Sequence, residues 1–137
     1  MASALYPKAK ESFLSQNPSI DMDTDTIKVA LVNTSTDYTY SSAHQYFSSV
    51  THYSGTTDQT LGSVSVTSGV FDAADATFTS VAISGSKTVQ ALVIYKDTGT
   101  AATSPLIAYI DGFTAVTPNG GNITVTWDNG ASKIFAL

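Results

Sequence analysis

The stretch Val89-Gln90-Ala91-Leu92-Val93-Ile94-Tyr95 decides the fold. Apart from Gln90, its side chains are apolar on both alternating faces, which is typical of a strand covered on both sides. We therefore predict a central strand within residues 88–96. Seven further β-branched runs, separated by Gly, Asn, Asp and Ser, are also predicted to be strands: residues 26–33, 61–67, 70–71, 77–83, 106–111, 122–128 and 132–137.

The last strand but one has a different pattern. Residues 123–127 alternate strictly, so Ile123, Val125 and Trp127 are predicted to point inward and the two intervening threonines toward water. Asp128-Asn129-Gly130 then supplies turn chemistry. We expect these residues to close a hairpin between this strand and the final one.

A helix is predicted in the first fifteen residues. Pro7 suits the first turn of a helix, and Leu5, Ala9, Ser12 and Phe13 share one face by their spacing. The helix is therefore amphipathic and needs a surface to lie on. That surface is either its own sheet or a neighbouring molecule.

A second, inserted helix is predicted at residues 41–50. Ser41 can cap it, and the stripe that it would bury follows helical spacing: Ala43, Tyr46, Phe47 and Val50. Residues 52–60 are polar and are predicted to form a surface loop. The expected architecture is mainly β: a single β-sandwich or jelly-roll-like domain of seven or eight strands at residues 26–137, preceded by the N-terminal helix and lead-in at residues 1–25.

The composition of the chain argues against several classes of function. The 137 residues include six lysines, no arginine, eleven acidic residues and no cysteine, which gives a net charge of −5. So few basic groups argue against binding nucleic acid, whose phosphates are contacted largely by Lys and Arg. No apolar run approaches the length needed to span a bilayer, and no secretory signal is visible at the N-terminus. We expect a protein made in the cytoplasm, with no membrane partner and no disulfide.

The chemical motifs are weak. Asp21-Met22-Asp23-Thr24-Asp25 resembles the start of a calcium loop, but Thr26 stands where that loop needs glycine and Val32 where it needs a bidentate glutamate. A solvated turn is the preferred interpretation, and a weak, irregular cation site is the alternative. His44 and His52 are the only imidazoles, and no spacing joins them to a catalytic set. We expect no enzyme activity, cofactor or dedicated metal site.

Aromatic residues gather in one polar stretch. Five of them fall between positions 38 and 53: Tyr38, Tyr40, Tyr46, Phe47 and Tyr53. Tyrosines give large contact area at low entropic cost, so a protein or glycan interface is one interpretation. The other is that these rings cover the sheet and seat the inserted helix.

Five segments spread over most of the chain carry a resemblance: Lys28-Val29-Ala30-Leu31-Val32, Gly69-Val70-Phe71-Asp72-Ala73-Ala74-Asp75, Ala91-Leu92-Val93-Ile94-Tyr95-Lys96-Asp97-Thr98, Pro105-Leu106-Ile107-Ala108-Tyr109-Ile110-Asp111 and Thr124-Val125-Thr126-Trp127-Asp128-Asn129-Gly130. Together they resemble a group of small structural proteins encoded by tailed bacteriophages and prophages. The resemblance implies a noncatalytic role in the virion. It transfers no active-site residue.

The leading hypothesis is a capsid decoration or cement protein that binds the major capsid protein lattice as a small homo-oligomer. Leu5 and Phe13 are the predicted docking residues of the N-terminal segment, and Tyr38, Tyr40 and Tyr53 those of the aromatic stretch. A tail, neck or fibre-associated virion protein is the first alternative. A host-surface glycan-binding module, with exposed aromatics at residues 53–58, is the second.

Overall fold

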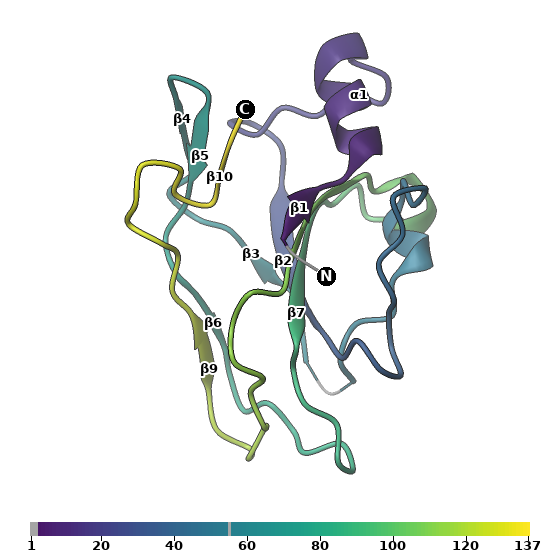
Figure 1. The fold of residues 1–137 in the computed structure, drawn as a ribbon, viewed down its shortest axis with the longest axis vertical. Helices are drawn as coiled ribbons and strands as arrows, with labels where there is room; N and C mark the ends of the chain where they lie inside the picture. Colours follow the sequence, from purple (N-terminus) through teal and green to yellow (C-terminus); the bar gives the residue numbers. More distant parts are fainter. Residues whose placement is uncertain (1–2, 55) are drawn as a thin grey trace.

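The computed structural model describes residues 3–54 and 56–137, and it is mainly β (Figure 1). Its largest sheet has five antiparallel strands in the order β1-β8-β7-β2-β3. The strands are β1 (Ala4–Leu5), β8 (Leu106–Ile110), β7 (Ala91–Lys96), β2 (Ile27–Val32) and β3 (Gln59–Thr60). β7 is the middle strand, which confirms the prediction from its two apolar faces.

Two smaller sheets stand on one side of the large sheet (Figure 1). One has three strands in the order β10-β5-β4, and the other pairs β6 with β9. Their bounds are β4 (Ser65–Thr67), β5 (Val70–Asp72), β6 (Ala76–Phe78), β9 (Ile123–Val125) and β10 (Phe135–Ala136). The mainly β class is therefore confirmed. A single sandwich of two continuous sheets is not, because the small sheets are separate from each other.

Side chains of the large sheet alternate between two apolar cores. On β7, Leu92 and Ile94 enter the core shared with the small sheets, whereas Val93 and Tyr95 enter the opposite core. We call the first side the aliphatic face. The second is the tyrosine face, because four buried tyrosines pack there: Tyr6, Tyr38, Tyr95 and Tyr109.

A β-bulge between β7 and β8 adjusts this alternation. Ile94 pairs with Ala108, but the next residue, Tyr95, pairs with Leu106, so Ile107 is an extra residue in β8. As a result Ile107 and Ala108 both belong to the core of the aliphatic face. The bulge thus keeps both sides of the sheet filled although one strand carries an additional residue.

Helix α1 (Pro7–Ser15) begins at Pro7, as predicted. It ends at Ser15, and the next residue, Gln16, caps it with a left-handed φ of 58° and a backbone N–H that donates to the Ser12 carbonyl. Ala9 and Ser12 are buried, and Phe13 packs against the protein's own cores. The surface beneath the helix is therefore the same molecule. Leu5, predicted on the helix face, belongs to the preceding strand β1.

The inserted helix predicted at residues 41–50 is wrong. The structure has turns there and a single 3-10 turn, η1 (Phe47–Ser49). The backbone pairs across the chain instead: the Phe47 N–H donates to the Ser104 carbonyl, and the Leu106 N–H donates to the Gln45 carbonyl. These bonds to the residues just after a second 3-10 turn, η2 (Ala101–Thr103), take the place of the intrahelical bonds that the expected helix would need.

The predicted C-terminal hairpin is also wrong. β9 pairs with β6, and β10 pairs with β5, so the turn residues 128–130 join two different small sheets. The predicted alternation in this strand is confirmed: Ile123 and Val125 are half-buried, and Trp127 is buried. Within the described residues, no helix has the length and apolar character that a bilayer crossing requires.

Candidate functional site: a groove beside strand β9

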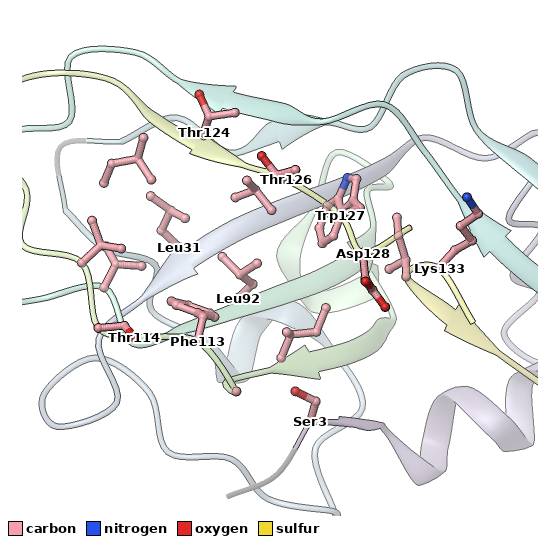
Figure 2. Close-up of a pocket in the computed structure, with 17 residues that line it drawn as sticks. Ser3, Leu31, Leu92, Phe113, Thr114, Thr124, Thr126, Trp127, Asp128 and Lys133 are labelled. Atoms are coloured by element: carbon pink, nitrogen blue, oxygen red, sulfur yellow. The ribbon is translucent and has the colours of Figure 1, made fainter. Parts of the chain in front are cut away.

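A groove of about 460 Å³ opens on the aliphatic face, between β9 and the large sheet (Figure 2). Its floor is formed by buried aliphatic side chains, among them Leu31 of β2, Leu92 of β7 and Val89. Leu31 and Leu92 point to this face of the large sheet because their neighbours in sequence point to the tyrosine face. The groove therefore exists because the small sheets cover this face incompletely.

The rim of the groove is mostly neutral. Thr124 and Thr126 of the β9 segment line one side, and Phe113 and Thr114 of the segment after β8 line the other (Figure 2). Phe113 is 36% exposed, although it is a large apolar residue. The groove thus presents apolar surface to whatever occupies it, framed by hydroxyl groups.

The backbone of β9 adds an unpaired edge to this rim. The Trp127 N–H donates to an Asp75 carboxylate oxygen, and the Gly121 C=O accepts from the Val81 N–H. Both partners lie on the side of β9 where β6 runs, so the odd-numbered residues of this segment direct their backbone N–H and C=O groups toward β6. The N–H and C=O groups of Thr124 and Thr126 consequently point away from β6. Among the described strands, β6 is the only one that pairs with β9.

The tyrosine face is organised by hydroxyl groups. Tyr38 Oη lies 2.8 Å from Tyr6 Oη and 2.8 Å from His44 Nδ1, so it links a fully buried ring to a half-buried imidazole. Burial, and then the hydrogen bond with Tyr38, raises the pKa of Tyr6 above its ordinary value. Burial is also the main reason that the pKa of Tyr38 is raised. Predicted docking residue Tyr38 is therefore part of the core.

Tyr40 and Tyr53 are placed differently from each other. Tyr40 is half-buried and packs its ring against Tyr6 and Tyr109, at centroid distances of 5.1 and 5.2 Å. Tyr53 is fully buried in the aliphatic core, where its hydroxyl donates to the Ala82 carbonyl at 3.0 Å. Tyr53 offers no exposed ring of the kind that the glycan-binding alternative expected.

A second polar group on the tyrosine face joins Tyr95, Asp58 and His52. Tyr95 Oη donates to Asp58 Oδ2 at 2.6 Å, and burial followed by this carboxylate raises the Tyr95 pKa. His52 Nδ1 lies 3.2 Å from Asp58 Oδ1, within ion-pair distance, but the alignment is too poor for Oδ1 to accept a hydrogen bond. The Phe47 ring stacks on the Tyr95 ring, with 3.9 Å between the two ring centroids.

The predicted docking residues of the N-terminal segment rest on the protein itself. Leu5 pairs with Ala108 of β8 and is half-buried. The Phe13 ring lies 6.5 Å from the Phe135 ring, centroid to centroid. The exposed apolar residue of this helix is Leu14, which is 89% exposed.

The acidic segment Asp21–Asp25 forms a turn held by its own hydrogen bonds. An Asp21 carboxylate oxygen accepts from the Asp23 N–H at 3.0 Å, and the Asp23 N–H is the main cause of the lowered pKa of Asp21. One Asp25 oxygen accepts from the Asp21 N–H and lies 2.9 Å from Lys96 Nζ. The part of the chain that the structure describes contains no group of three or more His, Cys, Asp or Glu side chains placed to hold a metal.

The sequence did not indicate the groove. Its floor and rim come from segments that are far apart in the chain, and the alternation at residues 123–127 predicts only that Thr124 and Thr126 point toward water. Comparison of the sequence with protein-family models finds no match, and comparisons with curated proteins and with solved structures find none either.

Proposed function

We propose that this chain is a noncatalytic structural protein of a tailed-phage virion, which acts by holding a neighbouring protein chain against its aliphatic face. In its leading form it is a decoration protein on the major capsid protein lattice. The large sheet and the small sheets would then serve as the two layers of a sandwich-like binding domain. The groove beside β9, with its apolar floor and unpaired strand edge, is the observation that supports a binding role, and the resemblance of five sequence segments to tailed-phage structural proteins supports the place in the virion.

The chemistry of the groove favours contact over catalysis. Of the side chains that line it among the described residues, only Asp128 and Lys133 are charged, and none is an imidazole. Burial of neutral apolar surface against a partner is little affected by salt, which suits attachment to a particle. A weakly charged surface therefore supports binding through shape and area.

The proposal is tested by quantifying the chain in purified virions of the phage or prophage that carries its coding sequence. Quantitative mass spectrometry should find it at a level comparable with the major capsid protein. A level far below the capsid protein would place it in the tail, neck or fibre instead. Absence from the virion would overturn the structural role.

A matched pair of variants connects incorporation to the groove. Thr126→Lys puts a long cationic side chain on the groove rim, whereas Thr100→Lys puts the same side chain on an exposed loop outside the groove. Virions assembled with Thr126→Lys should contain less of the protein than those with Thr100→Lys. Equal incorporation would show that the chain attaches through another surface.

A further inference from the structure

We infer that the groove accepts an extended segment of a neighbouring polypeptide, which adds as a strand to the free edge of β9. This inference rests on the proposed structural role and specifies what the aliphatic face holds. The occupant is a strand whose alternate side chains are apolar, and it binds through both its backbone and those side chains.

The backbone edge supplies the first part of the argument. Thr124 and Thr126 are two residues apart, so their outward N–H and C=O groups repeat about every 6.6 to 6.8 Å along the strand. That repeat is the spacing at which a second strand offers its own donors and acceptors. An added strand would therefore satisfy both threonine backbones without any change in β9.

The floor supplies the second part. A strand beside β9 turns every second side chain toward the large sheet, where Leu31, Leu92 and Ile110 line the groove. A volume of about 460 Å³ lies within the range of roughly 300–1,000 Å³ typical of binding pockets. Apolar side chains at alternate positions would fill this space and cover the apolar lining that is still exposed, which includes Ile110 and Phe113.

The charged side chains of the groove favour one composition for the segment that it would accept. Asp128 and Lys133, the two charged lining residues, gather at one end of the groove, near Trp127 (Figure 2). Elsewhere the lining is apolar or bears hydroxyls. Charge complementarity therefore favours a segment that is apolar along most of its length and carries a charged or polar residue where it passes Asp128 and Lys133.

The edge also lacks the usual protection against pairing. Natural edge strands are commonly blocked by a proline, a lysine or a bulge. Residues 123–126 read Ile-Thr-Val-Thr, with none of these blocking residues, and β9 pairs with β6 without a register shift. An open edge of strongly β-forming residues next to an apolar groove is suited to receiving a strand.

The experiment selects peptides from a random 12-residue library against the intact chain. The test variant is Thr124→Pro, which removes an N–H that points away from β6, at the free edge of β9. The matched control is Thr77→Pro: Thr77 is the register partner of Thr124, so its N–H points outward from the opposite edge of the same two-stranded sheet. Proline is tolerated at such edge positions.

Selected peptides should be apolar at alternate positions. They should bind Thr124→Pro at least about tenfold more weakly than the unaltered chain, as expected for the loss of an edge hydrogen bond and its alignment. Binding to Thr77→Pro should be unchanged. Three outcomes would overturn the inference: no enriched peptide, a consensus without alternation, or equal binding to both proline variants.

A second measurement is independent of whether Thr124→Pro folds. Amide hydrogen exchange at Thr124 and Thr126 of the unaltered chain should slow when a selected peptide is added. Unchanged exchange at both amides would also overturn the inference. The two proposals fail separately: a virion protein whose edge selects no strand loses only this inference, and a strand-binding chain absent from virions loses only the structural role.

Discussion

The two faces of the large sheet are covered in different ways. On the tyrosine face, hydroxyl groups fix distant segments onto the sheet: Tyr38 links Tyr6 to His44, and Tyr95 is held by Asp58. On the aliphatic face, Leu92 forms part of a floor that is left under an open groove. A buried hydroxyl demands one particular partner, whereas an aliphatic side chain accepts any apolar surface. The first face is thus specified within the molecule, and the second is suited to another chain.

The largest expected effect concerns the anchor of the aliphatic face. Trp127 is buried, and its indole N–H donates to the Ala74 carbonyl at 3.0 Å. Trp127→Ala should lower the free energy of unfolding by about 3 to 5 kcal/mol, because it removes a large core side chain and leaves a cavity. Urea denaturation measures this change. A loss below about 1 kcal/mol would show that the indole does not anchor β9 to the core.

Alkaline pH should act on the tyrosine face. The pKa values of Tyr6 and Tyr95 are raised above the ordinary value of 10.0, mainly by burial. Below pH 10 the folded and the unfolded chain both keep these phenol protons, so the stability that the two tyrosines contribute is fully present. Above pH 10 the unfolded chain loses them while the folded chain retains them, so the free energy of unfolding falls by about 1.4 kcal/mol per pH unit for each such tyrosine.

Urea denaturation between pH 8 and pH 12, together with tyrosinate absorbance, measures this loss. The absorbance of the buried rings should appear only as the protein unfolds. Titration of all seven tyrosines near pH 10 with no loss of stability would contradict the description of the tyrosine face as closed.

A smaller effect is expected from one hydroxyl. Tyr38→Phe removes the link between Tyr6 and His44 and leaves the buried Tyr6 hydroxyl without this partner. The free energy of unfolding should fall by about 1 to 3 kcal/mol. Tyr40→Phe is the matched control, because its half-buried ring packs on the same face, and it should change stability by less than about 0.5 kcal/mol. Equal effects would mean that the hydroxyl link contributes nothing of its own.

The smallest effect lies at the end of the sheet, outside the contrast between the faces. Lys28 Nζ lies 2.9 Å from Asp97, and this contact is the main cause of the lowered pKa of Asp97. A lowered pKa adds stability that is present above the unfolded value of 3.8 and is lost as pH falls through the folded value. Asp97→Asn should remove this acid dependence at a cost of at most about 1 kcal/mol.

Denaturation between pH 2 and pH 7 compares Asp97→Asn with the unaltered chain. The two should differ at neutral pH and converge in acid. A difference that grows as the pH falls would contradict the stabilising role of the contact with Lys28.

Features set by local pattern could be predicted from the sequence. The apolar run at residues 89–95 identified the central strand, because a strand covered on both faces needs no polar side. Alternation identified Trp127 as buried, and Pro7 marked the start of α1. Each of these outcomes depends on a residue and its immediate neighbours.

Features set by distant pairing could not be predicted. The turn residues 128–130 indicated a hairpin, but Thr124 pairs with Thr77, which is 47 residues away. Tyr53 lies in a polar stretch and is nevertheless buried, because its ring packs in the aliphatic core and its hydroxyl donates to the Ala82 carbonyl on another segment. The groove was not visible for the same reason, since Leu31 and Leu92 meet only after the sheet has formed.

The central claim is that the groove on the aliphatic face and the edge of β9 beside it are open in the free molecule and are covered by a neighbouring chain in the assembled particle. Amide hydrogen exchange at Thr124 and Thr126, measured on the free protein and on the protein recovered in virions, tests it most directly. Rapid exchange in the free protein and at least about tenfold slower exchange in the particle is the predicted result. Slow exchange already in the free protein, or equal rates in both, would contradict the claim.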